Sequence, residues 1–219
     1  MRSLFLSVII AFCLCSAKGQ DPVPAFKRSH DAASVFIDMP RDMAIMLTDD
    51  NRREMVNLYA EKKEATVQNL SGGESELLEL AHTYLKLRLT EQNTFELKLL
   101  YNNSGAVICV VQTACAPVCD SRISLYTINW ESITNVELLP QLLAAKFLNN
   151  RGMESEARRN ALANLDIHFF MYELNAKNDK LKVYYTTPNY LNSDARMRVA
   201  PFLTGKPVML QWKLDDGFR

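Results

Sequence analysis

Two neighbouring segments of this 219-residue chain alternate regularly between apolar and charged or polar side chains. They are residues 84–90 (YLKLRLT) and 94–99 (TFELKL). Because successive side chains of a β-strand point to opposite faces, each segment is expected to form a strand with one apolar and one charged face. Such strands are typical of antiparallel sheets that are buried on one face and exposed to water on the other. This pattern constrains the fold more than any other feature of the sequence.

Helical periodicity is found on both sides of these segments. Pro40 suits the first turn of a short helix that ends near Leu47, and Thr48 can cap the helix that follows. A second pair of helices is predicted within residues 138–165, with a break near Gly152. We therefore predict an α+β fold in which helices cover one face of an antiparallel sheet.

The order of these elements suggests an internal duplication. Each half of the chain, residues 35–133 and residues 134–219, is predicted to contain a helix-loop-helix followed by a β-meander. The alternative is that an α+β protein has this order by chance, since the halves share few identical residues. The further strands expected in the two halves are residues 106–113, 121–127, 168–174, 181–186 and 208–213.

The N-terminal segment has the features of a secretory signal peptide. Arg2 precedes an apolar run at residues 4–14, and the small residues Ala17 and Gly19 occupy the positions expected just before a cleavage site. Cleavage after Ala17 is the alternative. A membrane anchor is disfavoured because the run is too short to span a bilayer. We therefore expect residues 1–19 to be removed during export.

The mature chain is expected to begin with a flexible lead-in. Residues 20–34 are polar, contain two prolines and have no periodicity, whereas residues 35–219 are predicted to form a single α+β domain. No later segment has the roughly 18 consecutive apolar residues of a transmembrane helix, so none is predicted in the mature chain. Lipid attachment at Cys13 or Cys15 is disfavoured, because each follows a bulky residue instead of a small one.

Three of the five cysteines belong to the predicted mature chain. Cys115 and Cys119 lie close together in the segment CAPVC, where Pro117 favours a turn over a helix. In an oxidising compartment this pair is a candidate for a small disulfide loop. Cys109 lies within an apolar run and is interpreted as a small buried side chain.

The sequence contains none of the common motifs for catalysis or cofactor binding. The three histidines, His30, His82 and His168, form no HExxH motif and no closely spaced pair, so neither a metal nor another cofactor is predicted. A GxSxG elbow and the glycine-rich loops of nucleotide-binding proteins are also missing. No catalytic residues are therefore predicted, and an enzyme that uses scattered carboxylates is kept as one alternative.

The charge distribution gives little indication of a partner. The chain has 25 basic and 25 acidic residues, so it has no overall positive field that would attract nucleic acid. The pairs Arg52–Arg53 and Arg158–Arg159 are interpreted as solvated helix faces. A shared surface for an anionic partner is the alternative interpretation of these arginines.

Aromatic residues near the strand ends are the candidate binding residues. Tyr184 and Tyr185 are adjacent in a predicted strand, so one of them should lie on the water-exposed face. An exposed surface of tyrosine and tryptophan is typical of protein-binding sites. The alternative is that these side chains pack in the core beneath the helices. The residues predicted to form the surface are Trp130, Tyr184, Tyr185, Tyr190 and Trp212.

Several segments carry a family resemblance: residues 39–40 with 47–48, 51–55, 69–73, 85–90, 120–126, 185–188 and 210–213. In these segments the chain resembles an uncharacterised family of secreted proteins from Bacteroidales, which is catalogued as a domain of unknown function. The resemblance covers nearly the whole mature chain. It implies an exported protein of a Gram-negative bacterium, in the periplasm or at the cell surface, and supplies no catalytic residues.

Together with this resemblance, the missing catalytic motifs and the aromatic residues near the strand ends favour a non-enzymatic binding or adaptor protein of the bacterial envelope. Its partner would be another envelope protein, which it would contact through the aromatic sheet face. The alternative is a periplasmic carrier in which a curved sheet holds an apolar ligand.

Overall fold

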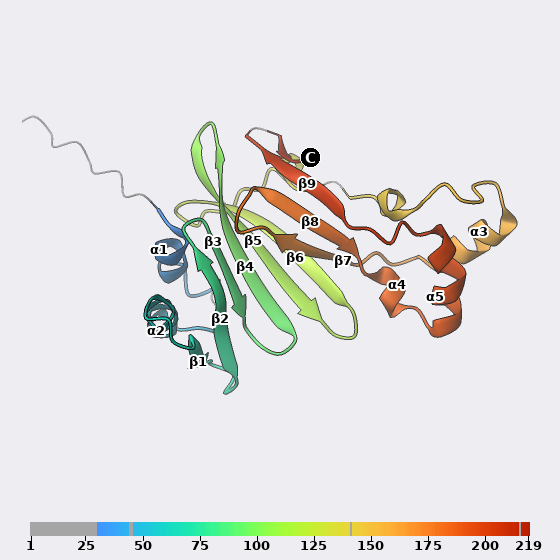
Figure 1. Ribbon diagram of the computed structural model, residues 1–219. Coiled ribbons are helices and arrows are strands. Elements are labelled where there is room, and N and C mark those ends of the chain that lie inside the picture. The colour runs from blue at the N-terminus through green and yellow to red at the C-terminus, as the bar shows by residue number, and fades with distance from the viewer. Residues whose placement is uncertain (1–29, 44–45, 141, 215) are drawn as a thin grey trace, which may run out of the picture.

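The structure is a computed structural model that describes residues 30–43, 46–140, 142–214 and 216–219. These residues form two antiparallel sheets and several short helices (Figure 1), so the predicted α+β class is confirmed. The predicted signal peptide and residues 20–29 of the predicted lead-in lie outside the described residues. Within the described part of the chain, no helix is long and apolar enough to span a membrane.

The larger sheet has six strands that follow one another in sequence order. Its third and fourth strands are the segments with alternating side chains, and Leu85 pairs with Leu97 while Leu87 pairs with Phe95. The apolar positions therefore lie side by side on one face, as the alternation predicts. The strands are β1 (Thr66–Gln68), β2 (Glu74–Ala81), β3 (Tyr84–Arg88), β4 (Asn93–Asn102), β5 (Gly105–Cys115) and β6 (Cys119–Thr127).

Strands β1 and β2 are not predicted from the sequence. In β2 the apolar residues Leu77 and Leu78 are adjacent, which breaks the alternation, and the pairing with β3 changes register between Leu77 and Glu79. The turn between β1 and β2 includes Gly72, whose φ of 81° lies in the left-handed region that favours glycine. An irregular strand of this kind has too weak a period to be recognised locally.

The smaller sheet has four strands in the order β10-β9-β8-β7. It packs on one face of the larger sheet, where Val111 and Leu125 share a core with Leu181 and Val183 of the smaller sheet. Figure 1 shows β7, β8 and β9 lying across the region of β5 and β6. The strands are β7 (Phe170–Leu174), β8 (Lys180–Tyr185), β9 (Val208–Lys213) and β10 (Gly217–Phe218).

Two helices, α1 (Ala32–Ile37) and α2 (Asp49–Ala60), cover the opposite face of the larger sheet near β2 and β3 (Figure 1). Thr48 caps α2 as predicted, because its side chain accepts a hydrogen bond from the backbone of Asn51. The prediction for the residues before Thr48 is wrong. A helix capped by Asp31 begins inside the predicted lead-in, and residues 41–43 form a turn where a helix starting at Pro40 was expected.

Of the second predicted pair of helices, the first is wrong and the second is confirmed as α3, which is shorter than expected. Residues 138–165 contain short 3-10 segments and one helix of two turns, and Leu143 at the start of η2 makes no side-chain capping bond. The two predicted halves consequently differ, since α4 and α5 separate β8 from β9 while the first six strands are continuous. The remaining elements are η1 (Val136–Leu138), η2 (Ala144–Phe147), α3 (Glu156–Leu162), α4 (Thr187–Tyr190), α5 (Ser193–Val199) and η3 (Ala200–Phe202).

The charged face of β4 is buried, contrary to the expected exposure to water, whereas Lys86 and Arg88 of β3 stay partly or fully exposed. Glu96 and Lys98 are each only 3% exposed, because the smaller sheet covers this face. Their charges are compensated there: Glu96 contacts Lys86 at 3.1 Å and accepts a hydrogen bond from the backbone of Leu174 at 2.9 Å. The larger sheet is therefore covered on both faces, by helices on one and by strands on the other.

Candidate functional site

The two tryptophans predicted to bind a partner are core residues on opposite faces of the larger sheet. Trp130 is 6% exposed in the helix-covered core, and its indole N–H donates to the carbonyl of Val35 at 3.2 Å. Trp212 is also 6% exposed, in the core between the sheets, and donates to the carbonyl of Tyr101 at 2.7 Å. For these two residues the alternative of core packing is correct.

The three predicted tyrosines do not join the tryptophans in one surface. The Tyr184 hydroxyl donates to Glu173 at 3.1 Å, and Tyr185 stacks on Phe147 with 5.4 Å between ring centroids. Tyr190, on α4, is 52% exposed. Only Tyr184 and Tyr185 share a hollow, and its volume is about 130 Å³. The structure therefore contains no continuous aromatic face made of the five predicted residues.

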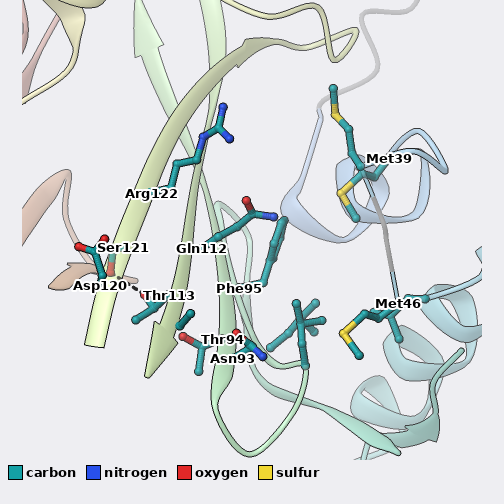
Figure 2. Close-up of a pocket in the computed structure, with 15 residues that line it drawn as sticks. Met39, Met46, Asn93, Thr94, Phe95, Gln112, Thr113, Asp120, Ser121 and Arg122 are labelled. Carbon is teal, nitrogen blue, oxygen red and sulfur yellow. Dashed lines mark hydrogen bonds between the residues drawn. The ribbon is translucent and has the colours of Figure 1, made fainter. Parts of the chain in front are cut away.

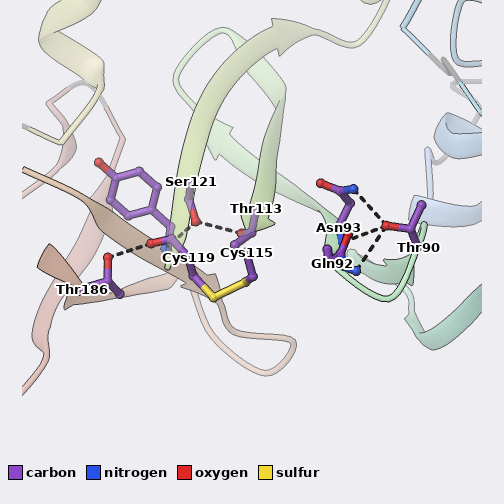
Figure 3. The surroundings of a disulfide bond; sticks show 9 residues. Thr90, Gln92, Asn93, Thr113, Cys115, Cys119, Ser121 and Thr186 are labelled. Atoms are coloured by element: carbon purple, nitrogen blue, oxygen red, sulfur yellow. Dashed lines mark hydrogen bonds between the residues drawn. A yellow bond between two sulfur atoms is a disulfide. The ribbon is translucent and has the colours of Figure 1, made fainter. Parts of the chain in front are cut away.

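The predicted disulfide is present between Cys115 and Cys119 (Figure 3). It closes the hairpin of β5 and β6, and the hydroxyl of Thr186 donates to the carbonyl of Cys119 at 2.7 Å. The disulfide region is thus tied to the smaller sheet. Cys109 is fully buried, and burial raises the pKa of its thiol, so a nucleophilic thiolate is disfavoured.

A hollow with several apolar walls lies between the α1–α2 connector, of which residues 38–43 and 46–48 are described, and the strands that the helices leave uncovered (Figure 2). Its volume is about 420 Å³. Figure 2 shows Met39 and Met46 facing the strands that carry Phe95 and Gln112. The apolar residues that line this pocket are Met39, Met43, Met46, Leu47, Leu87, Leu89, Phe95 and Ala114.

The floor of the pocket changes from apolar to charged across the sheet. In one row of directly paired residues, Leu87 is followed by Phe95, then by Gln112 and then by Arg122. Leu87 and Phe95 are buried beneath the connector, whereas Gln112 and Arg122 are exposed. Because paired residues of adjacent strands share one face, these four side chains line the same side of the sheet. The pocket is therefore apolar at one end and polar at the other.

A buried arginine holds the wall of the pocket in place. Arg52 is 1% exposed, and its guanidinium donates to the carbonyls of Ile37 at 3.1 Å, Met39 at 2.8 Å and Leu47 at 3.2 Å. It also forms an ion pair with Asp49 at 3.0 Å. The interpretation of Arg52 as part of a solvated helix face is therefore wrong. Burial lowers the pKa of Arg52, and the Asp49 carboxylate opposes that shift.

The position of Arg52 could have been found from helix geometry. Residues three or four positions apart share a helix face, so Arg52 shares one with Met55 and Val56. Met55 is fully buried. An arginine on a buried helix face indicates that its guanidinium binds backbone carbonyls or a carboxylate. Arg53, by contrast, is exposed as predicted.

The buried charged side chains of β4 make hydrogen bonds that connect the larger sheet to the smaller one. The second carboxylate oxygen of Glu96 accepts hydrogen bonds from the Tyr84 hydroxyl at 3.2 Å and from the Leu174 backbone. Lys98 donates to the carbonyl of Ala176 at 3.1 Å. Burial raises the pKa of Glu96 and lowers that of Lys98. Among the residues that the structure describes, no group of three or more histidine, cysteine or acidic side chains could hold a metal ion.

Comparisons with known proteins agree with the family resemblance. Residues 26–216 match a family described as "Protein of unknown function (DUF3256)". A solved structure of a domain of an uncharacterized protein from Porphyromonas gingivalis W83 is similar, with a TM-score of 0.74 and 23% sequence identity. The similarity covers 85% of this chain and 96% of that chain, and it shows a shared fold. Among curated proteins there is no significant match. The expected likeness to a Bacteroidales family of unknown function is thus confirmed.

Proposed function

We propose that this chain, which belongs to the DUF3256 family of proteins of unknown function, is a binding protein that holds an apolar ligand in the pocket beneath the α1–α2 connector. The observation that carries the proposal is the hollow of about 420 Å³ between the connector methionines and Phe95. Cavities of roughly 300–1,000 Å³ with mostly apolar walls are typical of small-molecule sites.

The chemistry of the wall supports an apolar ligand. Met39, Met43 and Met46 come from the connector, and the unbranched, polarizable methionine side chain adapts to ligands of irregular shape. Phe95 and Leu87 provide a rigid floor opposite them, because both are held within the sheet. Adaptable methionine side chains against a fixed apolar floor suit a flexible aliphatic chain better than a rigid polar molecule.

The pocket is preferred over an aromatic adaptor surface as the main site. The adaptor hypothesis requires one continuous face of five aromatic residues, and two of them, Trp130 and Trp212, are engaged in the core. The pocket instead fits the alternative of a carrier in which a sheet holds an apolar ligand, with no reaction assigned to it. We place this carrier in the envelope of a Gram-negative bacterium. The N-terminal signal features and the Cys115–Cys119 disulfide support export, since disulfides persist in oxidising compartments.

A dye-binding experiment tests the pocket. N-phenyl-1-naphthylamine is an uncharged dye that fluoresces strongly in apolar surroundings, and we expect saturable binding to the folded protein. Ala114 lies at an exposed position of β5 that lines the pocket, so Ala114→Phe places a ring in the hollow. We expect this variant to lose about tenfold or more in dye affinity, which corresponds to about 1.4 kcal/mol.

The matched control is Ala81→Phe. Ala81 is also an exposed strand residue, at the end of β2, and it does not line the pocket. It should bind the dye like the unmodified protein. Equal dye binding by all three proteins would contradict the proposed site, and so would the absence of saturable binding.

A further inference from the structure

We propose that the ligand is an aliphatic chain that ends in a carboxylate, and that the guanidinium of Arg122 binds this carboxylate. This inference rests on the proposed function and specifies the chemical class of its ligand. It starts from the row of paired residues Leu87, Phe95, Gln112 and Arg122, which crosses β3, β4, β5 and β6. The row places a cation at the polar end of the pocket, away from its apolar end.

Arg122 is available for an external partner. Its side chain is exposed, and its guanidinium makes no hydrogen bond or ion pair with the residues that the structure describes. Figure 2 shows it on β6, beyond Gln112. Its planar fork can donate two parallel hydrogen bonds to a carboxylate. The neighbouring Gln112 amide can donate a further hydrogen bond to the same group.

The order of side chains along the row matches an amphipathic acid. An aliphatic chain lying across the strands would cover Leu87 and Phe95 beneath the connector methionines. Its head group would then reach Gln112 and Arg122, where water can still solvate it. The reverse orientation would bury the carboxylate among leucine and methionine side chains, which is strongly unfavourable.

Two acidic side chains near Arg122 decide between a phosphate and a carboxylate as the head group. Asp120 lies two residues before Arg122 on β6 and accepts a hydrogen bond from the backbone of Phe170 at 3.1 Å. Asp42 lines the adjoining hollow of about 180 Å³ together with Arg122. These carboxylates repel a dianionic phosphate more strongly than a singly charged carboxylate. Of these two head groups, a site with one arginine and two acidic side chains therefore favours the carboxylate over the phosphate.

The test compares three ligands with one chain length and different head groups. Decanoate, decanol and decylamine are titrated below their micelle concentrations, and displacement of N-phenyl-1-naphthylamine reports their affinities. We expect decanoate to bind most tightly. Arg122→Gln should weaken decanoate binding about tenfold, a change typical of one charge-assisted contact, and leave decanol binding within about twofold.

Two further variants check the sign of the electrostatic effect. Asp120→Asn removes a repelling charge and keeps an oxygen acceptor for the Phe170 N–H, so it should strengthen decanoate binding without affecting decanol. Arg196→Gln removes a charge from an exposed position on α5, outside the pocket, and should change neither affinity. Thermal unfolding of each variant verifies that it folds.

The outcomes separate this inference from the proposed function. If decanol binds as tightly as decanoate, or if Arg122→Gln leaves decanoate binding unchanged, the carboxylate inference is wrong and the apolar pocket stands. Tighter binding of decylamine would overturn it in the same way. If the dye itself fails to bind, the proposed function fails, and the inference that rests on it fails too.

Discussion

At the scale of single residues, Arg52 connects the folding of the chain to the shape of the pocket. Its guanidinium binds three backbone carbonyls on the two sides of the α1–α2 connector. Those carbonyls belong to or adjoin the pocket wall, since Met39 and Leu47 both line the hollow. One buried side chain therefore replaces the backbone hydrogen bonds that a regular element would have provided.

We predict that Arg52→Ala destabilises the protein by about 3 kcal/mol or more, because it leaves three carbonyl acceptors without their charged donor. Urea unfolding measures this loss. The neighbouring exposed residue supplies the control, and Arg53→Ala should change stability by less than about 0.5 kcal/mol. Similar effects of the two substitutions would show that Arg52 does not hold the connector.

The buried carboxylate of Glu96 gives a pH-dependent prediction. Burial raises the pKa of Glu96 in the folded protein above its value in the unfolded chain, so the folded state binds the proton more tightly. The stability that this group contributes is complete below the unfolded pKa and is lost as the pH rises through the folded pKa. Glu96→Gln removes this loss, so the variant should gain stability relative to the unmodified protein as the pH rises from the acidic range.

Unfolding free energies measured across that pH range test the direction. The control is Glu79→Gln, at an exposed position of β2, for which we expect no comparable trend. The prediction would be wrong if the unmodified protein became more stable relative to Glu96→Gln as the pH rises. The ion pair with Lys86 would then stabilise the ionised carboxylate by more than burial destabilises it.

At the scale of secondary-structure elements, the hairpin of β5 and β6 is fastened at its end. The Cys115–Cys119 disulfide closes it, and the hydroxyl of Thr186 links it to the segment after β8. Nearby, Ser121 contacts Thr113 at 2.7 Å and accepts a hydrogen bond from the backbone of Tyr172. The end of this hairpin, which belongs to the larger sheet, is therefore also bonded to residues in and next to the smaller sheet.

We predict that replacing both cysteines, in Cys115→Ser with Cys119→Ser, lowers the unfolding free energy by about 2 kcal/mol, the loop-closure value for a short disulfide loop. A reductant should destabilise the unmodified protein by a similar amount and leave the double variant unchanged. These effects are measured by denaturant unfolding. An equal response of the two proteins to the reductant would contradict the assignment, because the only other described cysteine, Cys109, is not bridged.

Elements with strong local signals were predictable from the sequence, but their partners in space were not. The alternation of β3 and β4 and the cap at Thr48 depend on residues close together in the chain. Glu96 is covered by β7, whose residue Leu174 binds its carboxylate and lies 78 residues away in the sequence. Nothing near Glu96 in the sequence indicates that a second sheet will bury its face, so the local pattern alone predicts an exposed strand face.

At the scale of the whole molecule, the pocket is made by elements that meet only in the folded chain. The connector supplies methionines, β3 and β4 supply the apolar floor, and β5 and β6 supply Gln112 and Arg122. Each of these residues is unremarkable in its local sequence, which is why the candidate site was missed. The aromatic residues were conspicuous instead, and Trp130 and Trp212 prove to be core residues on opposite faces of the larger sheet.

The most direct test of the apolar pocket is an NMR titration with decanol, in which isotope-labelled methionine methyl groups are observed. Met39, Met43 and Met46 line the pocket, whereas Met153 and Met197 are exposed and lie outside it. We predict saturable shifts of the first three methyl resonances and unchanged positions for the other two. Shifts confined to the exposed methionines, or no saturable shifts of Met39, Met43 and Met46, would contradict the proposed pocket.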